Sequence, residues 1–257
     1  MHLARSLFAD VTCLKKEPIM RIAGVDLAWQ SQKNTSAVCI GKIYDDALRV
    51  TELYPAMYGI AKVLEVLLGA SNLCGIAIDA PLIIKNQSGQ RLCEKNLSKL
   101  YGSRWAAAYP TNKTLYPNAK SVELSCRLEQ EGFLHLGSEK WQIECYPYPA
   151  IIETFGLEKR LPYKKGKVLD RKNGQKRLAN FLKALSGSKV LKLDFEIDAP
   201  IIDERYIDSL RGNQLKINED ALDSILCLYI AALYRLGIKS TTFGTVESGY
   251  IYVPQKY

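Results

Sequence analysis

The 257-residue chain contains only two histidines, His2 and His135, and its seven cysteines form no CxxC pair. Two histidines are too few for a multi-histidine zinc site and leave little for a serine–histidine–aspartate triad. Scattered cysteines without paired spacing are typical of small core residues in a reducing compartment, so we expect a cytoplasmic protein. Any chemistry of this chain must therefore rely on carboxylates.

Long hydrophobic runs are also missing. The longest, residues 225–234, is about half the length that a membrane-spanning helix needs. Charged residues interrupt the first 20 residues, so they do not match a secretory signal. We interpret 1–20 as a disordered leader, with Met20 as an alternative start. The 47% apolar and 24% charged content excludes a disordered or collagen-like chain, so residues 21–257 are expected to form a single domain.

Hydrophobic patterning predicts an α/β fold with one central five-stranded mixed sheet and flanking helices. Its first three strands are expected to pair antiparallel. Strands are predicted at 21–29, 36–43, 47–54, 74–79 and 141–146, the last ended by prolines, with a terminal hairpin at 243–253. Helices are predicted at 56–68 (stopped by Gly69), 89–101, 121–131, 150–155, 175–185 and 218–236, the last capped by Asn218. Helical insertions are expected at about 85–140 and 155–215.

A net charge of +8 favours a polyanionic partner. Residues 159–177 are rich in lysine and arginine and contain one acid, Asp170, so this segment is a candidate for nucleic-acid binding. An aromatic residue among such charges can stack on an unpaired base. A solvated loop and helix face explains the same charge run equally well. The candidate nucleic-acid-binding residues are Tyr163, Lys164, Lys165, Lys167, Arg171 and Lys172, together with Arg91 from a second basic patch.

Five acidic residues occupy unusual positions. Asp26 and Glu144 interrupt apolar strands and Asp79 ends one, whereas Asp220 and Asp223 are three apart on one face of the last helix. An ionised carboxylate in such surroundings is costly unless a basic side chain or a hard divalent cation compensates it. Taken singly, each acid is equally well explained as a strand-end or helix-cap carboxylate. Taken together, they predict a cation site.

Several short motifs resemble a known family. They are GVDLAW at 24–29, IAIDAP at 76–81, IECYP at 143–147, EDALDSILCLYIAA at 219–232 and GYIYVP at 249–254. Their order and setting resemble the domain-of-unknown-function family 429, a predicted nuclease family of the RNase H-like superfamily, over residues 21–253. The acids at positions 26, 79, 220 and 223 are more distantly similar to the acidic quartet of RuvC-type resolvases. Glu219 departs from the family pattern, because a histidine is expected there.

The resemblance implies a metal-dependent phosphodiester hydrolase, a nuclease, that uses two Mg²⁺ or Mn²⁺ ions. Asp26 would bridge both ions, Asp79 would bind one, and Asp220 or Asp223 the other. For Glu144, three interpretations stay open: a metal ligand, a water-orienting group, or the partner of an arginine. The implied partner is nucleic acid, and no membrane is involved.

Two other functions are considered. One is a non-catalytic nucleic-acid-binding protein on the same RNase H-like scaffold. The other is an ATP-dependent phosphotransferase of the actin and sugar-kinase superfamily. The phosphotransferase is disfavoured because the turn after Asp26 has no glycine that would let backbone amides approach a phosphate. Cys145, beside Glu144, is interpreted as a buried thiol, since no histidine lies near it in sequence to activate it.

Overall fold

The computed structural model describes residues 20–30, 33–45 and 47–256. Apart from Met20, the expected leader lies outside these residues. The strands are β1 (Met20–Asp26), β2 (Ser36–Ile43), β3 (Ala47–Met57), β4 (Leu73–Asp79), β5 (Leu134–His135), β6 (Trp141–Glu144), β7 (Lys192–Phe195), β8 (Ser240–Thr245) and β9 (Gly249–Pro254). The helices are α1 (Gly59–Gly69), α2 (Leu92–Tyr101), α3 (Lys120–Gln130), α4 (Pro147–Thr154), α5 (Val168–Ala184), α6 (Glu204–Ser209) and α7 (Gln214–Arg235), with 3₁₀ turns at Leu185–Gly187 and Pro200–Ile202.

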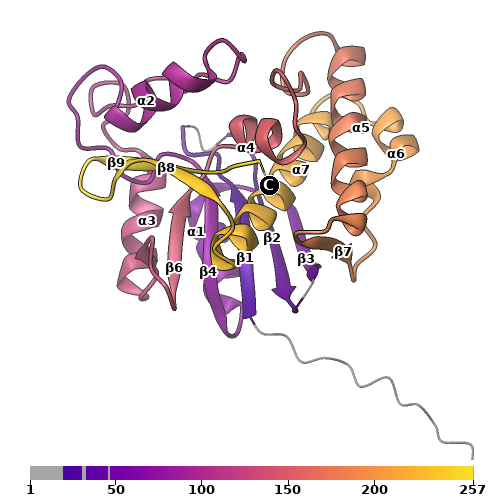
Figure 1. The fold of residues 1–257 in the computed structure, drawn as a ribbon, viewed down its shortest axis with the longest axis horizontal. Coiled ribbons are helices and arrows are strands. Elements are labelled where there is room, and N and C mark those ends of the chain that lie inside the picture. The colour runs from indigo at the N-terminus through magenta and orange to yellow at the C-terminus, as the bar shows by residue number, and fades with distance from the viewer. Residues whose placement is uncertain (1–19, 31–32, 46, 257) are drawn as a thin grey trace, which may run out of the picture.

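The α/β fold is built on one mixed sheet with the strand order β5-β6-β4-β1-β2-β3-β7 (Figure 1). The first three strands pair antiparallel, as the sequence predicts, and β4 runs parallel to β1. The prediction of five strands is wrong, because the sheet has seven. The two additional strands, β5 and β7, lie at the edges and pair parallel with β6 and β3. With two and four residues, they are too short to show a hydrophobic period.

Helices flank the sheet, and α7 is the one that organises the core. Residues 221–233 of α7 are almost all apolar and fully buried, which is the pattern of a helix surrounded by other elements. It packs against β1, β2, β3 and β4, whereas α1 packs against β2 and α3. Within the described ranges, no helix is long and apolar enough to cross a bilayer.

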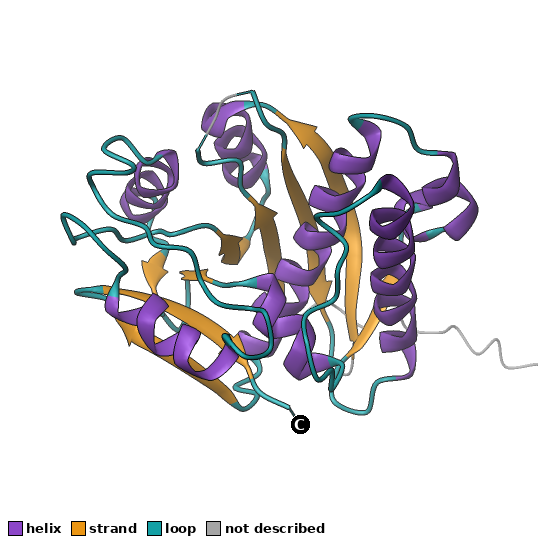
Figure 2. Ribbon diagram, turned by 90° about the horizontal axis from the view of Figure 1, so that it is seen from above, coloured by secondary structure: helices purple, strands orange, loops and turns teal. Residues whose placement is uncertain are grey.

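The C-terminal hairpin of β8 and β9 forms a separate two-stranded sheet, which confirms the predicted hairpin. Helix α2 packs on both of its strands, and this unit stands beside the main sheet when viewed from above (Figure 2). A single bridge between Cys145 and Tyr252 joins β9 to the end of β6.

Several predicted helix boundaries need correction. Helix α7 begins at Gln214 rather than Asn218, and Asn218 is buried within it, where its Nδ2 donates to Gln175 Oε1 at 3.0 Å. Helix α4 begins at Pro147 because proline fits the first turn, where no amide donor is needed. Strand β3 continues to Met57, so α1 begins only at Gly59. Gly69 is the last helical residue rather than the stop.

Candidate acidic site

Two carboxylates meet at the ends of neighbouring strands. Asp26 is the last residue of β1, Asp79 is the last residue of β4, and the two are paired in the parallel register. Both side chains are partly buried. Parallel neighbours present the same edge of the sheet at their carboxyl ends, so the register itself places the acids side by side.

Helix α7 brings two more acids to this edge because it lies against the backbone of β1. A Cβ atom at Gly24 would lie 2.0 Å from Leu228 N and 2.3 Å from Ser224 O. Only a glycine permits this approach. Gly24 is two residues before Asp26 and therefore on the same face of the strand, so the contact that Gly24 allows also brings Asp220 and Asp223 towards Asp26.

Three of the predicted acids form a compact cluster. One carboxylate oxygen each from Asp26, Asp79 and Asp223 lie within 4.8 Å of one another. Asp223 is fully buried, and the Tyr163 hydroxyl donates to its Oδ1 at 2.6 Å. Among the described residues, no donor reaches Asp223 Oδ2 with hydrogen-bond geometry, although Lys164 Nζ lies 2.6 Å away and forms an ion pair with it. Lys164 Nζ is also 3.7 Å from Asp79 Oδ2.

Asp220 is not part of this three-acid cluster and is already paired. The Thr35 hydroxyl donates to Asp220 Oδ2 at 2.7 Å, and Lys216 forms an ion pair with Oδ1. Asp26, Asp220 and Lys216 line a small cavity of about 140 Å³. Two ammonium groups, one from Lys164 and one from Lys216, therefore stand among the four aspartates.

Burial makes these acids reluctant to ionise. Burial raises the pKa of Asp26 well above its usual value, Lys164 opposes the rise, and the neighbouring aspartates add to it. Burial likewise raises the pKa of Asp79 to about 7, against the attraction of Lys164. A further positive charge at the cluster would favour the ionised form of both groups.

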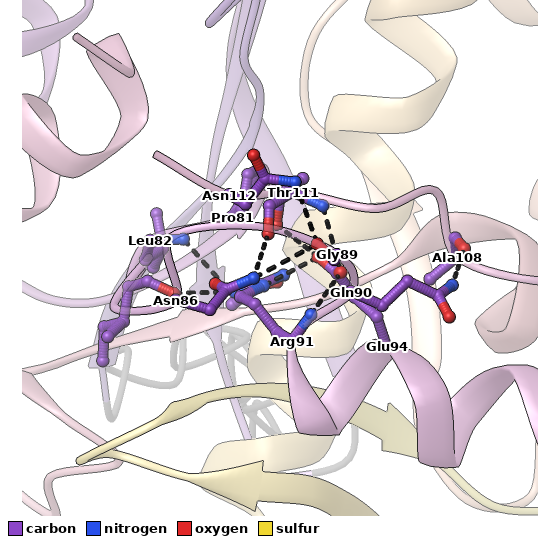
Figure 3. Close-up of polar contacts among 12 residues, drawn as sticks. Pro81, Leu82, Asn86, Gly89, Gln90, Arg91, Glu94, Ala108, Thr111 and Asn112 are labelled. Carbon is purple, nitrogen blue, oxygen red and sulfur yellow. Dashed lines mark hydrogen bonds and ion pairs between the residues drawn. The ribbon is translucent and has the colours of Figure 1, made fainter. Parts of the chain in front are cut away.

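Glu144 belongs to a different set of contacts. Its two oxygens accept from the Arg91 guanidinium at 2.6 and 2.9 Å, and one of them also accepts from Leu82 N at 2.9 Å. Arg91 Nε donates to Glu94 at 2.7 Å (Figure 3). The side chains of Arg91, Glu94 and Glu144 are all buried. Of the three interpretations of Glu144, the structure shows the arginine partner. Arg91, which the sequence predicts to bind nucleic acid, is buried in this contact.

The predicted basic segment is divided among different environments. Lys165 and Lys167 are exposed, and Arg171 is partly buried beside Glu219. Lys172 is buried and donates to the backbone oxygen of Asp208 at 2.7 Å. Tyr163 is fully buried and bonded to Asp223, so its ring offers no face to a base. Lys164 points into the acidic cluster.

Sequence reasoning missed the contacts of four residues that complete the site: Lys216, Thr35, Tyr163 and Lys164. Lys216 is four residues before Asp220 on α7, and this spacing places two side chains on one helix face. Starting the helix at Asn218 hid that relation. Thr35 lies in the turn before β2, and nothing in the sequence around it indicates its contact with Asp220.

Comparison with known proteins identifies the family. The family model "Protein of unknown function (DUF429)" matches residues 24–248, so the chain belongs to this family. The matched range includes all the acids of the site and both lysines. No curated protein and no solved structure matches the chain.

Proposed function

We propose that this DUF429 member is a divalent-metal-dependent phosphodiester hydrolase that acts on nucleic acid, a nuclease with an RNase H-like fold. The observation that carries the proposal is the convergence of Asp26, Asp79 and Asp223 from three separate elements, with oxygens within 4.8 Å of one another. Carboxylate oxygens at such spacing are the ligands that Mg²⁺ and Mn²⁺ prefer.

The residues present fit a divalent ion. Asp223 Oδ2 is buried and, among the described residues, is contacted by the Lys164 ammonium without hydrogen-bond geometry, so a metal ion that displaced Lys164 could bind this oxygen. When all three carboxylates are ionised, the Lys164 ammonium leaves a surplus of negative charge that one divalent ion would neutralise. The cavity between Asp26 and Asp220 is the place for a second cation, next to the Lys216 ammonium.

Each residue has a defined role in this proposal. Asp26 would be shared by both ions, Asp79 and Asp223 would hold one, and Asp220 would hold the other. Bound ions supply an activated water and neutralise the charge that develops on the leaving oxygen. Tyr163 fixes the orientation of Asp223 through its hydrogen bond. Lys164 is positioned to contact a phosphate when it is not paired with Asp223.

The sheet supports the RNase H-like part of the proposal. Of its central strands β6-β4-β1-β2-β3, the last three pair antiparallel with one another, and β4 and β6 continue the sheet parallel to β1. The acids lie at the ends of β1 and β4 and on α7, which packs against these strands. This is the arrangement that the resemblance in sequence implies.

The test is cleavage of end-labelled single-stranded DNA, duplex DNA and RNA in Mg²⁺ or Mn²⁺ and in EDTA. We expect cleavage that requires the metal and is lost in Asp26→Asn. Asp208→Asn is the matched control and should cleave normally, because Asp208 is an exposed acid of α6 that pairs with Lys176 and lies outside the acidic cluster. Cleavage that continues in EDTA, or in Asp26→Asn, would refute the proposal. Binding without cleavage by the wild-type protein would favour the non-catalytic nucleic-acid-binding alternative.

A further inference from the structure

A cavity of about 300 Å³ adjoins the acidic cluster, and Asp79 and Lys164 belong to its wall. This volume is at the lower end of the range for small-molecule pockets in proteins. Because the cavity shares two residues with the cluster, a group bound inside it would be directly next to a phosphodiester held at the carboxylates.

Five of the nineteen residues that line the cavity are aromatic. They come from segments far apart in the chain: the turn after β1, the connection between α2 and α3, and the start of α4. Trp29 and Tyr116 contact each other edge to face with ring centroids 4.6 Å apart. The aromatic residues of the wall are Trp29, Tyr109, Tyr116, Tyr146 and Tyr148.

Positive charges accompany these rings. The Arg160 guanidinium lies 5.2 Å from the centre of the Tyr148 ring, and Lys165 Nζ lies 5.3 Å from that of Tyr109. Both basic residues line the cavity with Lys164. Aromatic rings that stack on bases, together with cations that follow the backbone, are the usual means of binding single-stranded nucleic acid.

The remaining wall contains charges that are already paired. Arg91, Glu94 and Glu144 line the cavity, and Arg91 forms ion pairs with both glutamates. Two carboxylates on one guanidinium leave no positive charge for a ligand, so this part of the cavity suits an uncharged, flat group better than a phosphate. Phosphate contacts are left to Arg160, Lys164 and Lys165.

We infer that the cavity binds a single unpaired base of the nucleic-acid substrate, so that the enzyme acts where a base is unpaired or extruded. This inference rests on the proposed function. A base within a duplex presents only its edges in the grooves and cannot enter such a cavity unless it leaves the stack. An intact duplex is accordingly expected to be the poorer substrate.

The experiment measures binding in Ca²⁺ by fluorescence anisotropy, with end-labelled single-stranded oligonucleotides. It compares an intact oligonucleotide with oligonucleotides that carry one abasic site at successive positions, and with a perfect duplex. The protein variants are Tyr109→Ala with Tyr116→Ala, and the control is Tyr206→Ala, an exposed tyrosine on α6 that lies outside the cavity.

We expect one abasic position to weaken binding roughly 5- to 100-fold, the range that stacking of one base supplies. The double variant should bind the intact oligonucleotide more weakly by a similar factor and should no longer distinguish the abasic one. Its dependence on salt should equal that of the wild type, because no phosphate contact is removed. The control should behave as the wild type.

Equal affinity for intact and abasic oligonucleotides at every position would overturn the inference, as would undiminished binding by the double variant or preferential binding of the perfect duplex. The proposed function is judged separately, by cleavage in Mg²⁺ or Mn²⁺. Cleavage without base discrimination refutes the cavity's role alone. Base discrimination without cleavage supports that role and refutes the hydrolase.

Discussion

Replacement of Gly24 by alanine tests how the site is assembled. The new Cβ would lie 2.0, 2.3 and 2.6 Å from backbone atoms of α7, whereas ordinary contacts begin near 3.4 Å. No rotamer change relieves a clash between two backbones, so α7 must retreat from β1 by roughly 1 Å or more. Because Asp26 is on β1 and Asp223 on α7, the same retreat would widen the carboxylate cluster.

The expected loss of stability is about 3 kcal/mol, the upper end of the range for inserting a methyl group into a packed core. Urea unfolding, followed by circular dichroism, measures it. If the protein is the proposed hydrolase, a misplacement of about 1 Å at the carboxylates lowers its cleavage rate by about 100-fold. Gly69→Ala is the control: apart from its chain neighbours and the backbone of its own helix, no described atom lies within 4 Å of the place its new Cβ would take, so it should be neutral or slightly stabilising. Wild-type stability in Gly24→Ala would refute the reasoning.

Three further predictions concern charge. Asp26→Asn should raise the urea midpoint in EDTA, because it removes a buried carboxylate that neighbouring acids repel; a lower midpoint would contradict this. Lys164→Met should lower the midpoint in EDTA and increase the thermal stabilisation given by Mg²⁺, as measured by calorimetry; an unchanged Mg²⁺ effect would argue against an ion at Asp79 and Asp223. Burial lowers the pKa of His135, partly offset by Glu129, so the unfolded chain binds this proton more readily. Stability should therefore fall as pH drops below about 6.5, the pKa of unperturbed histidine, and His135→Gln should lose that part of the pH dependence in urea titrations.

The sequence predicts those parts of the site that regular elements carry. Asp26 and Asp79 interrupt or end apolar strands, and a charge in such a place is conspicuous whatever surrounds the strand. The antiparallel order of the first three strands follows from their short connections. Asp220 and Asp223 are recognised as a pair because residues three apart on a helix lie on the same face.

Contacts made by irregular segments could not be predicted. Lys164 and Tyr163 lie in the connection between α4 and α5, among exposed charges, and composition alone suggests that such residues face solvent. Their contacts with Asp223 bridge about 60 residues of sequence and depend on tertiary packing. Asn218 has the sequence pattern of a helix N-cap, an asparagine followed by two acids, but its side chain donates a hydrogen bond to Gln175 instead.

If the site binds metal ions as proposed, the ion pairs of Lys164 and Lys216 would determine which ions can enter it. Each ammonium is tethered to the chain beside the carboxylate that it neutralises, so its local concentration far exceeds that of dissolved Na⁺ or K⁺. In the proposed hydrolase, monovalent ions would therefore compete poorly, whereas a divalent ion would gain enough from the clustered oxygens to displace the ammonium group. Before a metal ion binds, the Lys164 and Lys216 ammonium groups would neutralise the carboxylates at both proposed ion positions.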